Sequence, residues 1–404
     1  MVAPTPIDFQ TDARQSLGQL VTASAALIGE LGHRPQKPAD VVRALGLDRK
    51  LGWQIYRIAT ASDPMLAGPH LLSPASVRRL LEAADHAGVE PAIRQRLNDA
   101  FEDCELLIRR HATDRASFAL MAASSTDSNE IDVISTADRR AAFRAQSRIL
   151  GMTAASSFKT FFFHPGEPSR EFGDVVSLRG TSNLVPLRPQ LRWPITSAGL
   201  ISSDHEELDH GCQLLALPGC QTQAGISIIE PFCSQPLPKI EQHIEEDGSH
   251  RSDLVLEGIG RTHASTVVLG YRAPNTLQKV PDHSNNMILA NFPIRIPCEY
   301  CYLDVLVHQD LQWPNQFEPE IFGDSFEPGA PIFDRTHNLL PFHGNIKRGP
   351  ASRITAVEPP IENYQKLLDW TCSNIGWNLA DFHATRVIIQ YPVMPSTLCL
   401  RTSL

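Results

Sequence analysis

The stretch RPQKPADVVRALGLDRKLGWQIYRIAT, residues 34–60, decides how the first part of the chain is interpreted. Pro38 suits the first position of a helix, where a missing N–H costs nothing. Gly46 can end that helix in the left-handed conformation without strain, and Asp48 is placed to cap a second helix. The apolar positions recur at helical spacing and are Val41, Val42, Leu45, Leu51, Ile55 and Ile58. The stretch therefore predicts two short helices joined by a tight turn at 38–60.

The second of these helices is expected to carry a polar and basic face, made of Arg49, Lys50, Trp53, Gln54 and Arg57. A helix pair of this kind, with a basic and amide-bearing second helix, is typical of a helix-turn-helix DNA reader. Residues 34–57 contain six basic side chains against two acidic ones, whereas the whole chain has a net charge of −9. A local basic face on an acidic chain fits a reader that does not bind polyanions indiscriminately. In this interpretation Arg34, Lys37 and Arg43 contact the DNA backbone.

The run ADVVRALGLDRKLGWQIYRI, residues 39–58, resembles the DNA-binding segments of MarR- and IclR-type bacterial regulators. The resemblance implies that the chain turns between the helices at Val42–Leu45–Gly46–Leu47 and that residues 49–57 form the recognition helix. It also implies that Arg49, Lys50, Trp53, Gln54 and Arg57 face the groove, where arginine and glutamine read guanine and adenine edges. The chain departs from the family at Val42, where a small residue is preferred, and at Gly52, where an apolar β-branched residue usually packs. A glycine inside a helix costs about 1 kcal/mol relative to alanine.

Two other interpretations of the helix pair remain open. It is also consistent with part of an ordinary all-α bundle, or with a protein-interaction module that no longer meets DNA. Trp53 on the expected groove face supports the second of these, because tryptophan is enriched at protein contacts.

The composition limits the class of protein. A chain of 404 residues suits two or three domains, and 42% apolar with 20% charged residues permits a sizeable core. No apolar run approaches the roughly 18–20 residues needed to span a bilayer, and the first residues lack the pattern of a signal peptide. Eight cysteines have no framework spacing, which favours reduced thiols in a cytoplasmic protein without a membrane partner.

The pattern changes along the chain and predicts an α+β fold with an all-α first domain. Residues 11–125 are predicted to be a helical domain, 126–163 a connecting helix with a hinge at 124–132, and 164–404 an α+β domain with a mixed or antiparallel sheet. Residues 135–163 suit one long helix, or a helix followed by a strand. The loop at 61–72 is the only room for a β-hairpin wing. Further helices are predicted at 13–31, from Pro74, at 91–111 and at 361–377, and strands at 174–180, 225–232, 252–259, 265–271, 287–296, 302–308 and 385–393.

Arg140, Arg144 and Arg148 are spaced four residues apart and therefore share one stripe of a helix. Such a stripe either contacts an anion, on DNA or on a ligand, or is a solvated face, as charge stripes usually are.

No motif indicates a catalytic centre, a metal site or a cofactor. Cys298 and Cys301 form a lone CxxC within a strand-like run, where residues three apart face opposite sides, so buried apolar thiols are expected there. The other soft ligands, His205, His210, Cys212 and Cys220, are irregularly spaced. His205 and His210 are five residues apart, so the pair misses the one-turn spacing of a zinc-protease motif. The phosphate loop, dinucleotide fingerprint and nucleophile elbow are absent from the sequence.

The sequence thus predicts a cytoplasmic, sequence-specific regulator that binds double-stranded DNA and carries a carboxy-terminal effector domain, which senses a small-molecule ligand or holds a dimer together. Specific affinity normally requires two helix-turn-helix copies on neighbouring half-sites, so a homodimer is expected, with the helix at 91–111 in its interface. The alternatives are an enzyme with its active site in residues 170–404 and a protein-interaction adaptor.

Overall fold

The computed structural model describes residues 8–31, 37–125, 136–195, 215–223, 226–244, 250–279, 287–311, 313, 316–324, 334–335, 337–354, 361 and 363–403. The chain divides into two compact units, residues 1–134 and 135–404, here called the amino-terminal and carboxy-terminal units. The first is helical and the second is rich in sheet, so the predicted α+β class is confirmed. No helix in the described ranges is long and apolar enough to cross a bilayer.

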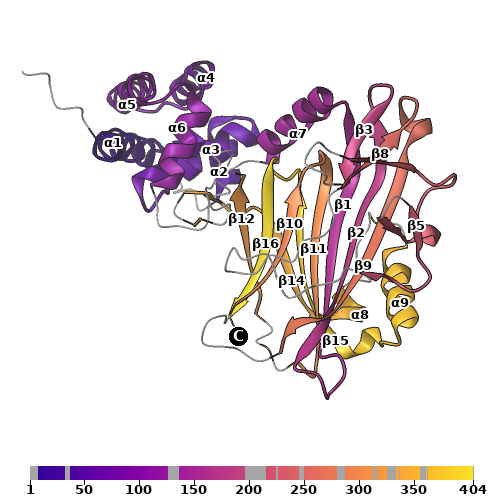
Figure 1. Cartoon of the computed structure of the whole chain (residues 1–404). Coiled ribbons are helices and arrows are strands. Elements are labelled where there is room, and N and C mark those ends of the chain that lie inside the picture. Colours follow the sequence, from indigo (N-terminus) through magenta and orange to yellow (C-terminus); the bar gives the residue numbers. More distant parts are fainter. Residues whose placement is uncertain are drawn as a thin grey trace, which may run out of the picture. The chain divides into compact units, whose positions relative to one another are not determined.

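The amino-terminal unit is a bundle of short and medium helices around one apolar core (Figure 1). The two longest, α1 and α5, pack along each other, and α1 also contacts α3. Each presents one apolar side to the core, which holds Leu17, Leu20, Ile55 and Leu97 with no exposed surface. The helices are α1 (Phe9–Gly29), α2 (Pro38–Leu45), α3 (Arg49–Ala59), η1 (Pro64–His70), α4 (Pro74–His86), α5 (Pro91–His111) and α6 (Arg115–Ser124).

The helix boundaries follow local capping signals. The side chain of Ser73 accepts a hydrogen bond from the Ser76 N–H at the start of α4, and Asp114 does the same for Ser117 at the start of α6. The loop at 61–72 contains the 3₁₀ helix η1, and the described part of this unit has no strand that could form a wing.

The carboxy-terminal unit is built on a nine-stranded sheet whose central strand is β1 (Met152–His164). Its order is β14-β15-β11-β1-β2-β9-β6-β5, with β4 paired to β9. β1 and β11 run parallel, and the other pairs are antiparallel. The other strands are β2 (Phe172–Pro186), β4 (Leu215–Ala216), β5 (Gln221–Gln223), β6 (Ile226–Ile228), β9 (Ser265–Gln278), β11 (Cys298–His308), β14 (Asn345–Pro350) and β15 (Phe382–Gln390).

Two smaller sheets and a helical layer complete this unit. One sheet has the order β10-β16-β12-β13 and the other β3-β8-β7. Their members are β10 (Met287–Ile294), β16 (Ser396–Ser403), β12 (Glu318–Gly323), β13 (Leu339–Leu340), β3 (Leu191–Ile195), β8 (His250–Leu256) and β7 (Lys239–Ile244). The helical elements are α7 (Thr136–Leu150), α8 (Ala351–Ile354), α9 (Tyr364–Ile375), η2 (Glu230–Phe232), η3 (Arg261–His263) and η4 (Leu379–Asp381).

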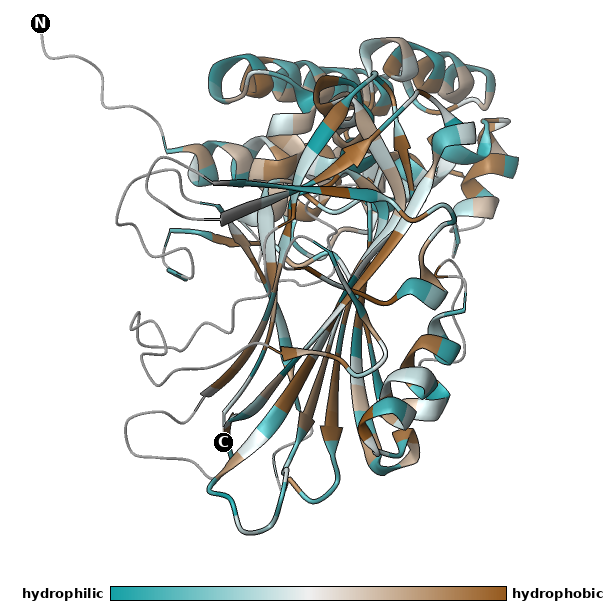
Figure 2. Ribbon diagram, turned by 45° about the vertical axis from the view of Figure 1, so that its right-hand side comes forward, coloured by the Kyte–Doolittle hydropathy of each residue, from teal (hydrophilic) through white to brown (hydrophobic). Residues whose placement is uncertain are grey.

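The large sheet separates two apolar cores, as expected when side chains alternate across a strand. Phe158 and Phe162 of β1 pack with α9 in one core, while Phe161 and Phe163 pack with the two smaller sheets in the other. Figures 1 and 2 show α8 and α9 together on one side of the large sheet. Because both faces are covered, the central strands are buried almost throughout and show no period-two alternation of buried and exposed residues.

The helical face of the sheet also contains a buried ion pair. Asp304 and Arg386, which are 0% and 1% exposed, lie opposite each other on β11 and β15. The arginine donates from Nε to Asp304 Oδ1 at 2.9 Å and from Nη2 to Oδ2 at 2.6 Å, and the Tyr364 hydroxyl donates to Oδ2 at 2.6 Å. The pair therefore joins two strands to α9.

The second unit begins earlier than the domain boundary expected from sequence. Residues 126–163 were predicted to be a connector, but α7 and β1 belong to the carboxy-terminal unit and β1 lies at the centre of its sheet. Gly151, with φ of 74°, makes the turn between them, so 136–163 is a helix followed by a strand. Residues 126–132, most of the expected hinge at 124–132, lie outside the described residues.

Candidate nucleic-acid interface

Helices α2 and α3 form the predicted helix-turn-helix, and the local chemistry of the turn matches the expectation. Pro38 is the first residue of α2, and Gly46 ends it with φ of 63°, the left-handed conformation. The Leu47 N–H then donates to the Val42 carbonyl at 3.1 Å. Asp48 caps α3 by accepting a hydrogen bond from the Leu51 N–H at 2.9 Å. The turn is therefore fixed by backbone geometry and one carboxylate.

The two helices meet at the residues that depart from the resembled family. A β-carbon placed on Gly52 would lie 2.4 Å from Cγ2 of Val42 and 3.3 Å from its Cα. Gly52 is thus small because Val42 fills the space that its side chain would occupy. The two departures compensate each other, with the larger residue on α2 and the smaller one on α3.

Four of the five α3 side chains that the sequence predicted to be on the polar face are exposed. Arg49, Trp53 and Arg57 are exposed and, being four residues apart, share one stripe, with Lys50 exposed beside it. Gln54 is only partly exposed because it lies on the flank, next to the buried side of the helix.

The structure also describes two of the three basic residues that were expected on the flanks of the motif. Arg43, near the end of α2, and Lys37, at its start, are both exposed. Arg34 lies outside the described residues.

Trp53 contacts a residue that sequence reasoning missed. Its ring meets His70 of η1 edge-on, with centroids 4.9 Å apart, and 44% of the tryptophan remains exposed. Burial lowers the pKa of His70, and the charge of Arg57 lowers it further. The imidazole is therefore biased towards its neutral form beside the basic stripe, where it packs under the tryptophan.

A second missed residue is Arg79 of α4, which pairs with Asp48 at 2.8 Å. The Leu51 N–H and this guanidinium lower the pKa of the Asp48 carboxyl. Arg79 thereby neutralises the charge of the Asp48 carboxylate at the amino-terminal end of α3, and the ion pair links α4 to that end of α3. The two residues are 31 positions apart, so no local pattern indicates the contact.

The arginine stripe of α7 belongs to the carboxy-terminal unit. Arg140, Arg144 and Arg148 are all exposed, as a solvated face would be, and the Arg140 guanidinium lies 5.9 Å from the centre of the Tyr391 ring. The buried cation of this helix is instead Arg139, which donates to the Gln390 carbonyl at 3.3 Å.

The cysteine and histidine candidates give no metal centre in the described part of the chain, where no group of three or more His, Cys, Asp or Glu side chains is suitably placed. Cys298 and Cys301 are buried and free, and burial raises the pKa of Cys298 to about 12. Cys220 is free and half-buried. His205, His210 and Cys212 lie outside the described residues.

No protein-family model matches the chain, and no curated protein matches it in sequence. The case for function therefore depends on the residues themselves.

Proposed function

We propose that this protein is a sequence-specific DNA-binding regulator whose amino-terminal unit reads double-stranded DNA and whose carboxy-terminal unit binds a small-molecule effector in the cytoplasm. The observation that carries the proposal is the capped, tightly packed helix pair with Arg49, Trp53 and Arg57 on one exposed stripe. A second helix of this kind enters the major groove with its amino-terminal residues against the base edges.

The side chains of the motif divide by position. Arg49 and Lys50, in the first turn of α3, are placed for base edges, where arginine pairs bidentately with guanine. Arg57, at the far end of the same stripe, and Arg43 and Lys37 on α2 are placed for phosphates, together with Arg34. Gln54 contributes from the flank.

A single motif of this size buries little surface, so we include a homodimer on two half-sites in the proposal. We assign the dimer contact to the outer side of α5, where Leu106 is 54% exposed. A groove of about 630 Å³ lies between α5 and α1, lined on α5 by Arg96, Asp99, Ala100 and Asp103. In sedimentation equilibrium, Leu106→Glu should shift the protein towards the monomer, whereas Leu120→Glu on α6, also exposed, should not.

The direct test is a selection of genomic DNA fragments by the purified full-length protein at two salt concentrations. The test variant is Arg49→Ala/Arg57→Ala, and its matched control is Arg188→Ala/Arg353→Ala, which removes two exposed arginines from the carboxy-terminal unit. We expect a two-fold-symmetric sequence that is enriched by the wild type and the control, lost by the test variant, and weakened by salt because counterions are released on binding. Absence of any enriched sequence would refute the proposal.

The exposed Trp53 favours one second candidate, a protein-interaction adaptor, because tryptophans at the centre of interfaces often dominate binding energy. In that case the selection would give no enriched sequence. Trp53→Ala would then weaken a protein complex that the double arginine variant leaves intact.

A further inference from the structure

A β-bulge interrupts the large sheet between β2 and β9. Two residues of β2, Ser182 and Asn183, occupy the place opposite one residue of β9, Thr266. Asn183 has φ of 51°, in the left-handed region, and its N–H donates to the Thr266 hydroxyl at 3.1 Å. Bulges often lie beside binding sites, because they re-aim side chains and interrupt the pairing of strands.

The segment that follows β6, residues 229–234, runs along β9 at the same point. The Ser234 N–H donates to the Thr266 carbonyl at 2.9 Å, and the Thr266 N–H donates to the Ser234 hydroxyl at 2.8 Å. The Val268 N–H donates to the sulfur of Cys233 at 3.3 Å. Backbone N–H groups therefore hold the hydroxyls of Ser234 and Thr266 next to each other.

A cavity of about 270 Å³ lies beside these two hydroxyls, between the sheet and the start of α9. Its apolar wall includes Phe158 of β1, Val268 of β9 and Leu367 of α9. Its polar wall includes Ser234 and Thr266, both of which are partly exposed. The cavity thus has an apolar part and a hydroxyl-bearing part.

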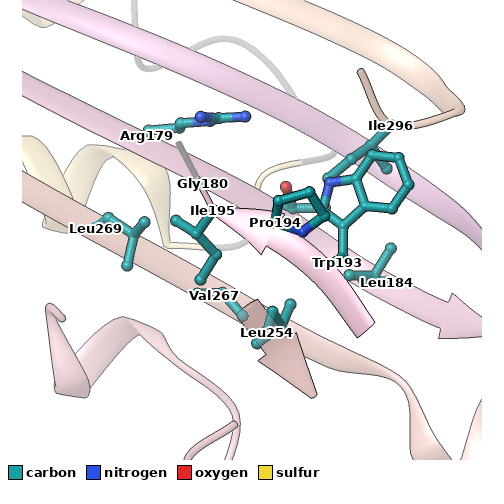
Figure 3. A pocket seen from close by; sticks show the side chains of 11 residues that line it. Arg179, Gly180, Leu184, Trp193, Pro194, Ile195, Leu254, Val267, Leu269 and Ile296 are labelled. Carbon is teal, nitrogen blue, oxygen red and sulfur yellow. The ribbon is translucent and has the colours of Figure 1, made fainter. Parts of the chain in front are cut away.

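The two faces of the sheet differ at this point. On the helical face the Phe158 ring lies over Gly180, where a β-carbon would be 2.2 Å from it. On the other face the cavity beside Gly180 is about 40 Å³, and β3 contributes Trp193, Pro194 and Ile195 to its wall (Figure 3). A space of that size admits only a few atoms, whereas a dry cavity of about 150 Å³ accommodates benzene. Of these two cavities, the one at Thr266 is therefore large enough for an organic molecule.

The chemistry of the larger cavity favours a neutral ligand. Among the residues that the structure describes, no charged side chain lines it. Burial raises the pKa of Cys233, which also lines it, to about 11, so the thiol is neutral at pH 7. A charged ligand would lose hydration here without gaining a counter-charge.

The two hydroxyls define the polar end of that ligand. Each already accepts a hydrogen bond from a backbone N–H, so its own proton is available to an acceptor. A carbonyl oxygen has two lone pairs and no proton, and it can accept from two neighbouring hydroxyls at once.

We propose that this cavity binds a small neutral carbonyl compound, a ketone, lactone or amide of about ten non-hydrogen atoms, whose oxygen accepts from the Ser234 and Thr266 hydroxyls. Its apolar body lies against Phe158, Val268 and Leu367. The inference rests on the proposed function for the role of this ligand, which is the effector of the regulator.

The test is isothermal titration calorimetry on the full-length protein without DNA, with probes of nearly equal size. Benzylacetone and δ-nonalactone carry a carbonyl, hydrocinnamate a carboxylate, phenylpropylamine an ammonium group, and butylbenzene no polar group. We expect one carbonyl probe to bind per chain, at least tenfold more tightly than the three other compounds.

Variants locate the binding. Ser234→Ala/Thr266→Val removes both donors and should weaken the carbonyl probe at least tenfold. The control Thr276→Val/Ser352→Ala removes two hydroxyls from the same unit outside the cavity and should leave binding unchanged. If the first variant does not fold, Ser182→Phe fills the partly exposed edge of the cavity and should abolish binding.

The proposal would be overturned if neither carbonyl compound bound, if a charged probe bound most tightly, or if Ser182→Phe bound as well as the wild type. Because the titrations contain no DNA, their outcome is separate from that of the fragment selection. A protein that enriches no DNA sequence and still binds the carbonyl probe would contradict the proposed function and keep this site.

Discussion

Val42 and Gly52 are in such close contact that a methyl group on the glycine would sit 2.4 Å from a methyl of the valine. Helix propensity alone favours alanine over glycine in α3 by about 1 kcal/mol. Overpacking a tight contact costs roughly 1–3 kcal/mol, so we expect Gly52→Ala to lower the free energy of unfolding, measured by urea denaturation. Val42→Ala/Gly52→Ala should recover most of that loss, giving a favourable coupling energy in the double-mutant cycle. If the effects of the two substitutions were additive, the Val42–Gly52 contact would not be the cause of the lost stability.

Arg57 should affect both the pKa of His70 and the binding of the proposed DNA. Its charge lowers the pKa of His70, after the larger effect of burial, so Arg57→Ala should raise that pKa part of the way towards 6.5 in an NMR titration. If Arg57 contacts a phosphate, the same variant reduces the salt slope of DNA binding by about one. Arg109→Ala, an exposed arginine on α5, serves as the control and should change neither quantity. A changed pKa with an unchanged slope would remove Arg57 from the DNA contact.

His164 is expected to resist protonation. Its ring stacks on Trp377 at 4.3 Å, and its Nδ1 accepts a hydrogen bond from the Gly166 N–H at 2.9 Å. Burial and the neighbouring His308 lower its pKa from 6.5 to about 4. A group whose pKa is lowered on folding contributes stability above its unfolded pKa and loses it as pH falls.

The unfolding free energy should therefore decrease as the pH falls from about 6.5 to 4, and His164→Gln should flatten that dependence. The comparison is urea denaturation at several pH values, with His383→Gln as the control because His383 is exposed. Identical pH profiles for wild type and His164→Gln would contradict this prediction.

Removing one partner of the Asp304–Arg386 pair should lower the free energy of unfolding far more than removing both partners. Asp304→Asn leaves a buried guanidinium without its counter-charge, which costs roughly 3–5 kcal/mol. Asp304→Leu/Arg386→Met removes both charges and should be much nearer the wild type in chemical denaturation. Tyr364→Phe removes one donor to Asp304 and should cost about 1 kcal/mol. If Asp304→Asn were as stable as the double variant, the pair would not carry charge in the folded protein.

The helix-turn-helix was predictable because its signals are local. Pro38, Gly46 and Asp48 act within a few residues of where they stand, and each does in the structure what its chemistry predicts. The sequence misled on Gly52, which looked unfavourable until its contact with Val42 was known. Asp48–Arg79 and Trp53–His70 join different helices, so neither local pattern nor spacing could indicate them.

The strands of the second unit were predictable only in part, since β7, β12 and β16 were not predicted, and their arrangement was not predictable. Apolar runs such as 302–308 and 385–393 mark strands that the structure contains as β11 and β15. β1 was ambiguous, because its run FKTFFF has apolar residues on both faces and the strand begins two residues after a helix. The burial of Lys159, Asp304 and Arg386 could not be predicted from the sequence, since a charged residue is assigned to the surface by default.

The parallel pairing of β1 with β11 has a consequence for synthesis. The side of β1 that pairs with β11 must wait until residues 298–308 have left the ribosome, more than 130 residues after β1 itself. At ordinary translation rates this takes on the order of ten seconds. During that interval all residues of the amino-terminal unit have been synthesised, whereas the backbone N–H and C=O groups on that side of β1 remain unpaired. The nascent chain is therefore most in need of chaperone protection after its amino-terminal unit is already complete.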